Sequence, residues 1–186
     1  ISGWADGYSN TVFRLLENLK VPRKGMIGAW GHKYPHMGGP GPVIDFLNEA
    51  VRWWDQWLKG KDTGVKDDPM LLAWMQDTVS PISSKRPGNW VAEQSWPAPE
   101  IREQVWNILF GVLSMDEKAE PDLKLTIQSP LSVGLFAGKW CSYSESTDLP
   151  SDQREEDGGS LIFDTPALDK NLEILGAPRL ELELSS

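Results

Sequence analysis

The first sixty residues carry hydrophobic positions at the spacing of two amphipathic helices. Ser9 or Asn10 can cap a first helix, which ends before Pro22. A second helix is predicted over residues 43–59, with a proline suited to its first turn and Gly60 suited to a left-handed C-cap. Its apolar stripe consists of Ile44, Leu47, Val51, Trp54 and Leu58. This wide stripe predicts that the second helix is buried against a sheet, with a second domain as a further surface that could cover it.

Short hydrophobic runs with a period of two replace the helical pattern after Lys66. They predict strands at residues 70–74, 89–94, 106–109, 123–128, 160–163 and 179–184. In the last of these, leucines alternate with glutamates, which is typical of a half-buried strand. Before Lys66, residues 26–27 predict a short buried strand. Many strands and few helices favour a β-sandwich or jelly roll in the second part of the chain.

The polar segments between these runs are expected to be loops. Residues 38–42 are glycines and prolines, which break both helices and strands. Residues 142–159 are polar and acidic, and we expect a solvated surface loop there. The chain therefore divides into an α/β segment, residues 1–66, and an all-β domain, residues 67–186.

Charge and composition narrow the function classes. A net charge of −9 argues against nucleic-acid binding, which needs a clustered basic face. No apolar run approaches the roughly 20 residues that span a bilayer, so no membrane partner is expected. No basic segment leads into an apolar run at the N-terminus, and the expected location is cytoplasmic. Cys141 is the only cysteine, so an internal disulfide is excluded, and we expect an inert thiol.

Asp6 and His32 are the candidate catalytic residues. Each lies in a turn rich in glycine and tryptophan, within Gly3–Gly7 and Gly28–His32, and the His32 turn follows an apolar run. An imidazole is the usual general base for a hydroxyl nucleophile, and an acid on its other nitrogen fixes the tautomer. An α/β-hydrolase presents the last two members of a Ser-Asp-His triad in this chain order. No G-x-S-x-G elbow occurs in the sequence to supply the first member.

Two alternatives use the same region. His32 and His36 are four positions apart and would bind zinc together on a helix, but Pro35 and the glycines that follow disfavour one. No metal site and no cofactor are therefore expected. Ser2 or Ser9 near the acid would give a triad in a different order, and neither lies in an elbow sequence.

Four blocks of sequence resemble the cocaine esterase and X-Pro dipeptidyl-peptidase group, the CocE/NonD hydrolases. Gly3-Trp4-Ala5-Asp6-Gly7-Tyr8 is similar to that family's acid turn, and Gly28-Ala29-Trp30-Gly31-His32 to its histidine turn, with Ala29 in place of proline. Residues 53–64 resemble its helix after the histidine. Residues 89–97 and 161–178 resemble parts of its C-terminal jelly roll.

The resemblance implies the C-terminal portion of an α/β-hydrolase core followed by an incomplete jelly roll. It implies that Asp6 is the triad acid and His32 the base, with the nucleophilic serine upstream of this chain. The expected function is part of a serine hydrolase that acts on ester, amide or X-Pro peptide bonds, with the upstream part of its own domain as a partner. The chain alone is expected to be inactive. The alternative is a non-catalytic β-sandwich binding module with a degenerate hydrolase remnant.

Overall fold

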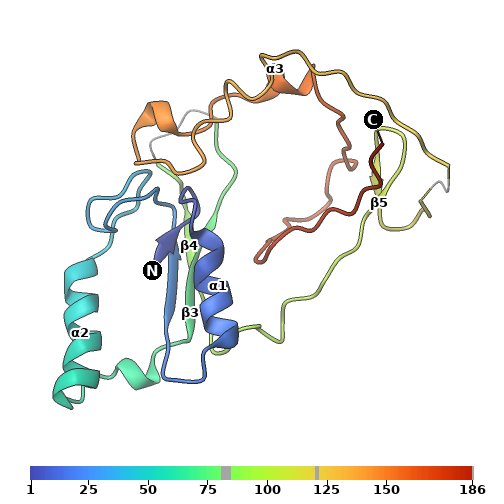
Figure 1. Ribbon diagram of the computed structural model, residues 1–186. Helices are drawn as coiled ribbons and strands as arrows, with labels where there is room; N and C mark the ends of the chain where they lie inside the picture. Colours follow the sequence, from blue (N-terminus) through green and yellow to red (C-terminus); the bar gives the residue numbers. More distant parts are fainter. Residues whose placement is uncertain (81–84, 120–121, 186) are drawn as a thin grey trace.

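A four-stranded mixed sheet forms the centre of the N-terminal half of the chain (Figure 1). The computed structural model describes residues 1–80, 85–119 and 122–185. The strands, in spatial order, are β1 (Ser2–Gly3), β2 (Gly25–Gly28), β3 (Leu71–Gln76) and β4 (Gly88–Glu93). The first three are parallel to one another, and β4 pairs antiparallel with β3. The first strand after residue 66 therefore belongs to the same sheet as the strands before it.

The core lies between this sheet and helix α1 (Ser9–Asn18). All four residues of β2 are buried, as the short apolar run predicts. Val12 and Leu16, four positions apart on α1, are buried against the sheet. The core cluster consists of Val12, Leu16, Ile27, Leu71 and Ala73. Tyr8 is the residue before the first turn of α1, so the expected serine or asparagine cap is wrong.

Helix α2 (Phe46–Lys59) forms where the stripe predicts a helix, but starts three residues later. Asp45 is its N-cap and accepts a hydrogen bond from the amide of Asn48, so the expected proline in the first turn lies outside the helix. Gly60 adopts the left-handed conformation at the C-terminus, with φ of 66°, which confirms the expected cap.

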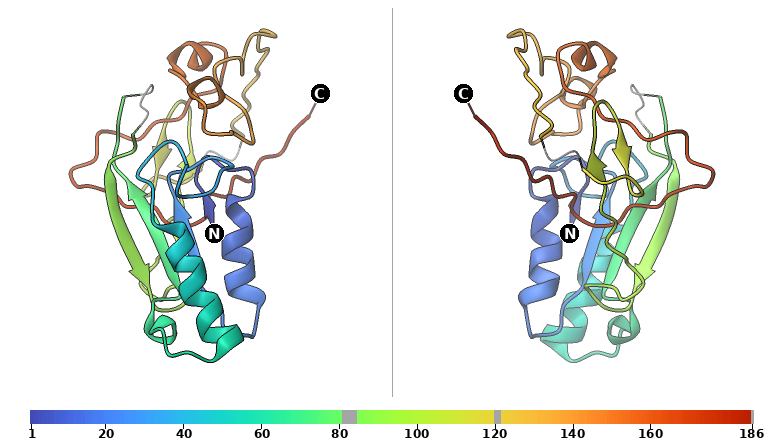
Figure 2. Two further views of the ribbon diagram at one scale, coloured as in Figure 1. Left: turned by 90° about the vertical axis from the view of Figure 1, so that its left-hand side faces the viewer. Right: turned by 90° about the vertical axis from the view of Figure 1, so that its right-hand side faces the viewer.

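The expected burial of α2 is wrong for the described residues. Gln56 is the one buried side chain of this helix, whereas Leu47, Val51 and Trp54 are each more than half exposed. The helix stands to one side of the sheet, apart from α1 (Figures 1 and 2). Polarity along the sequence predicts which face is apolar, but it does not predict what covers that face.

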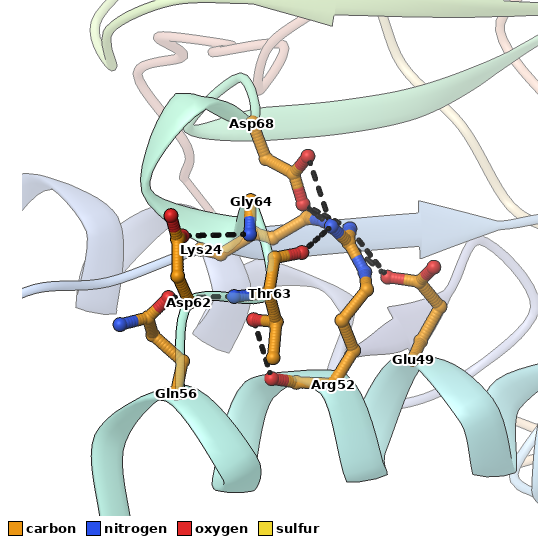
Figure 3. A network of polar contacts seen from close by, with 8 residues as sticks. All are labelled: Lys24, Glu49, Arg52, Gln56, Asp62, Thr63, Gly64 and Asp68. Carbon is orange, nitrogen blue, oxygen red and sulfur yellow. Dashed lines mark hydrogen bonds and ion pairs between the residues drawn. The ribbon is translucent and has the colours of Figure 1, made fainter. Parts of the chain in front are cut away.

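A network of hydrogen bonds and ion pairs connects α2 to the segments that lead into strands β2 and β3 (Figure 3). Asp68, which follows the short 3₁₀ helix η1 (Val65–Asp67), accepts hydrogen bonds from Arg52 of α2 and Lys24 of the chain leading into β2. Glu49 of α2 contacts both cations, at 3.4 Å from Lys24 and 3.2 Å from Arg52. Thr63 adds a hydrogen bond of 2.9 Å to the Arg52 carbonyl.

The second half of the described chain contains less regular structure than its pattern predicts. Strands β3 and β4 confirm two predicted runs, and β5 (Asn107–Ile108) pairs with β6 (Leu113–Ser114) at a third. The described residues at 123–128, 160–163 and 179–184 form no strand, so those expectations are wrong. Leu180, Leu182 and Leu184 are exposed, and none of the strands in the described part of the chain pairs with this segment. An alternating sequence becomes a strand only when a partner satisfies its backbone.

The acidic segment 142–159 is not uniformly solvated. It holds the 3₁₀ helix η2 (Ser146–Asp148) and a single helical turn, α3 (Arg154–Asp157). Asp148 is buried, and hydrogen bonds from Lys139 and the Tyr143 amide hold the pKa of its carboxyl below the usual value. Glu156 is also buried and accepts hydrogen bonds from two backbone amides, at Gly134 and Phe136. These two buried acids hold the loop together through hydrogen bonds to its backbone. The expectation that the whole segment is a solvated surface loop is therefore wrong.

Candidate active site

The site lies where the chain leaves β1 and β2, at one edge of the sheet. The two strands are parallel, so their carboxyl ends meet at the same edge. The amide of Trp4 donates to the Gly28 carbonyl at 2.8 Å, and the amide of Ala5 donates to the Trp30 carbonyl at 3.1 Å. The turns after the strands are therefore held side by side, and their side chains meet.

Asp6 and His32 are brought together by these two turns. Nδ1 of His32 lies 3.2 Å from each carboxylate oxygen of Asp6. The carboxylate side chain is 10% exposed and the imidazole side chain 42% exposed. The Asp6 carboxylate therefore lies on the less exposed side of the imidazole and contacts Nδ1. This leaves Nε2 as the ring nitrogen available to another reactant.

Two further groups orient the carboxylate of Asp6. The hydroxyl of Ser2 donates to Oδ2 at 3.2 Å, and the amide of Tyr8 donates to Oδ1 at 3.0 Å. Ser2 thus supports the acid and its hydroxyl is occupied there. Donors to the charged form fix the direction of the carboxylate toward the imidazole.

A loop from the second half of the chain forms one wall of the site. The amide of His32 donates to the Ser142 carbonyl, and Lys33 pairs with Glu145 at 3.0 Å. The rings of Tyr8 and Tyr143 each lie with their centroids 5.5 Å from that of His32. Sequence reasoning missed these loop residues, because nothing in a single sequence signals that positions so far apart meet.

Two hollows open beside the dyad of Asp6 and His32, on the protein surface. A groove of about 570 Å³ is bounded by Ser2, Asp6, His32, Tyr34, Met37 and Tyr143. A smaller hollow of about 300 Å³ reaches Asp6 from the side of Trp4, Trp140 and Asp148. The larger groove is the one that His32 lines, so a reactant would approach the imidazole there.

The other candidate residues lie differently. His36 is not on a helix with His32, and its ring stacks on Phe46 with centroids 5.9 Å apart. The amide of Ser9 donates to the Asp6 carbonyl, a backbone contact within the turn. Cys141 lies beside the dyad, with its Sγ and one ligand atom each of Asp6 and His32 all within 4.8 Å of one another. In the described part of the chain, no helix is long and apolar enough to cross a membrane.

Comparison with known proteins points to one group of hydrolases. A profile of the family described as "X-Pro dipeptidyl-peptidase C-terminal non-catalytic domain" matches residues 63–186. A protein of Bacillus anthracis named "Putative Xaa-Pro dipeptidyl-peptidase" is 23% identical over 172 residues, 90% of this chain. A protein of Mycobacterium bovis named "Putative serine esterase" is 26% identical over 128 residues, 65% of this chain. No solved structure matches the chain.

These relatives are much longer than this chain. It spans 24% of the length of the Bacillus protein and 18% of the mycobacterial one. Asp6 and His32 lie before residue 63, outside the segment that matches the non-catalytic domain.

Proposed function

Because this chain belongs to the X-Pro dipeptidyl-peptidase family of hydrolases, by the match of its C-terminal domain, we propose that it supplies two members of a catalytic triad. Asp6 is the acid and His32 the general base of a serine hydrolase, and the nucleophilic serine lies outside these 186 residues. Residues 1–66 are then the end of an α/β-hydrolase core, and residues 67–186 belong to a jelly-roll domain whose first two strands, β3 and β4, extend the sheet of that core. The substrate is an ester, an amide or an X-Pro peptide.

The observation that carries this proposal is the contact of both Asp6 oxygens with Nδ1 of His32 at 3.2 Å. An acceptor on Nδ1 favours the tautomer with the proton on that nitrogen, so Nε2 keeps its lone pair. Nε2 then removes the proton from a serine hydroxyl, returns it to the leaving group and activates water for deacylation. The imidazolium formed in these steps is stabilised by the buried carboxylate.

The test uses the complete protein. Fluorophosphonate labelling followed by mapping of the modified residue is expected to place the label on a serine outside this chain. Asp6→Asn is expected to lower the turnover of an ester by a factor of about 10⁴, and His32→Ala by a factor of about 10⁶, as in other triads of this type. His36→Gln and Asp62→Asn are matched controls, and they should keep near wild-type turnover. Unchanged turnover in Asp6→Asn or His32→Ala would refute the assignment.

A second candidate function rests on the word "non-catalytic" in the description of the matched family. Residues 63–186 then act as a binding or interaction module, and the dyad is a remnant. The same experiment separates the two. A complete protein that takes no fluorophosphonate label, and whose ligand binding is unaffected by Asp6→Asn, would favour the module.

A further inference from the structure

We propose that Asp6, His32 and Cys141 form a binding site for a single divalent metal ion of the zinc type, at the dyad itself. The inference does not depend on the hydrolase function, because it concerns the donor atoms and not the reaction. It differs from the expectation, drawn from sequence, that Cys141 is inert and that no metal site exists.

The donor set matches the chemistry of zinc. Zinc in proteins takes thiolate sulfur, imidazole nitrogen and carboxylate oxygen, with three protein ligands where a fourth position stays open. Here one donor of each type lies within 4.8 Å of the other two. A carboxylate, a thiolate and a neutral imidazole also carry the two negative charges that balance a divalent cation.

The separation of the nitrogen and oxygen donors fits two neighbouring ligands of a tetrahedral zinc ion. Zinc–nitrogen and zinc–oxygen bonds of about 2.1 Å at the tetrahedral angle place the two donor atoms about 3.4 Å apart. Nδ1 of His32 lies 3.2 Å from each oxygen of Asp6, so this edge is already formed. The Sγ of Cys141 lies within 4.8 Å of the other two donor atoms, and a zinc–sulfur bond of about 2.3 Å requires the thiol to approach them.

The surroundings of the three donors also suit a metal site. The hydroxyl of Ser2 and the amide of Tyr8 hold the Asp6 carboxylate in place, as outer-shell donors do around metal ligands. Lys139 is paired with Asp148 at 2.6 Å, and Lys33 with Glu145 at 3.0 Å. These two cations therefore do not occupy the carboxylate that the ion would bind. His32 lines the groove of about 570 Å³, which gives an ion a path from solvent.

Binding of the ion would change the state of the dyad. The ion takes the place of the proton between Nδ1 and the carboxylate, and that proton moves to Nε2. The imidazole stays neutral, and Nε2 no longer has a lone pair with which to accept a proton from a reactant. With the metal bound, His32 can therefore not act as a general base. Removal of the metal by a chelator restores the contact between His32 and Asp6. Binding of the ion also releases the proton of the Cys141 thiol, because zinc takes the thiolate form of cysteine.

Cobalt(II) and zinc(II) are the probes, and the full 186-residue chain is the sample. One equivalent of cobalt(II) should produce a thiolate-to-cobalt charge-transfer band, because Cys141 is the one cysteine of the sequence. Zinc affinity, from competition with a coloured chelator, should fall about 100-fold or more in Cys141→Ser, His32→Gln and Asp6→Asn. Loss of an outer-shell partner alone costs 10- to 100-fold, so loss of a ligand lies at or above that range. Asp152→Asn, whose carboxylate pairs with Arg154, is the control and should leave affinity unchanged.

A second readout covers the case in which a variant folds poorly. In the wild-type chain, zinc(II) should slow modification of Cys141 by a disulfide reagent at least tenfold, and His32→Gln should abolish that protection. The proposal is overturned if no charge-transfer band forms, or if zinc affinity and thiol protection survive replacement of His32. Neither measurement needs a serine or a substrate, so their failure would leave the proposed hydrolase untouched.

Discussion

Gly3 is the residue whose lack of a side chain lets the two turns of the site approach each other. A Cβ at this position would lie 1.9 Å from the Trp30 carbonyl oxygen, which is part of the backbone and has no freedom to move aside. The Trp30 carbonyl also accepts the hydrogen bond from Ala5, one residue before Asp6. Spacing between Asp6 and His32 therefore depends on a glycine three residues before the acid.

We expect Gly3→Ala to lower the free energy of unfolding by about 3 kcal/mol, at the upper end for overpacking, because the two backbones must separate. Thermal unfolding of the chain measures this. Gly158→Ala is the matched control, since its Cβ would meet only the Glu155 carbonyl at 3.5 Å, an ordinary contact. Equal stability of the two variants would show that the turns are not in close contact.

The partnership of Asp6 and His32 could be anticipated from sequence, because both residues lie in turns rich in glycine and tryptophan and the carboxyl ends of parallel strands meet at one edge of a sheet. The residues that surround Asp6 and His32 could not be predicted from the sequence. Cys141, Ser142 and Tyr143 come from a loop with no pattern of its own, and their contact with His32 is a matter of tertiary structure. A single sequence gives the separation of two residues along the chain, but it does not give their distance in the folded protein.

Among the elements, α2 depends on charge for its position. Burial opposes ionisation of the Asp68 carboxyl, but the hydrogen bonds from Lys24 and Arg52 outweigh it and hold its pKa below the usual value. A lowered pKa in the folded state means that Asp68 stabilises the fold above its unfolded pKa of about 3.9. That stabilisation is lost as the pH falls through the folded value.

We expect Asp68→Asn to lower the free energy of unfolding by about 1 to 3 kcal/mol at pH 7, between the ranges for exposed and buried ion pairs. The difference from wild type should shrink once the pH is below the folded pKa, because the wild-type carboxyl is then neutral as well. Urea unfolding at pH 7 and near pH 2 measures both values. Asp62→Asn is the control, and a difference that stays constant with pH would contradict the proposed ion pairing.

The helices and strands that the sequence predicted well are those whose formation depends on residues close together in the chain. Helix α2 has a stripe and a glycine cap, and β2 has a run of residues that are all buried. The segments predicted as strands at 123–128, 160–163 and 179–184 form none, because a strand needs a partner strand and the hydrophobic pattern of a sequence does not specify one. Helices satisfy their backbone within themselves, whereas strands do so only with a neighbour.

At the scale of the whole molecule, α2 presents an apolar face with nothing described against it. Leu47, Val51, Trp54 and Leu58 are between 54% and 73% exposed on one side of the helix. Soluble monomers seldom expose a contiguous apolar patch of more than a few hundred Å². The chain on its own is therefore expected to associate or to bind apolar dyes.

We expect the double variant Val51→Lys and Trp54→Lys to reduce self-association and dye fluorescence of the chain. Its free energy of unfolding should change by less than about 0.5 kcal/mol, since neither side chain is buried. Sedimentation and dye titration are the measurements, and Leu131→Lys, at an isolated exposed leucine, is the control. Dye binding that persists in the double variant would place the apolar surface elsewhere.

The pairing of Lys33 with Glu145 has a consequence for the order in which the molecule assembles. The two residues are 112 positions apart, and the adjoining contact of His32 with Ser142 closes a loop of similar length. Closing so long a loop costs chain entropy before any contact offsets it, and such non-local contacts slow folding. The sheet and α1 can form early from nearer residues, but the wall of the site is completed only when the last third of the chain is in place.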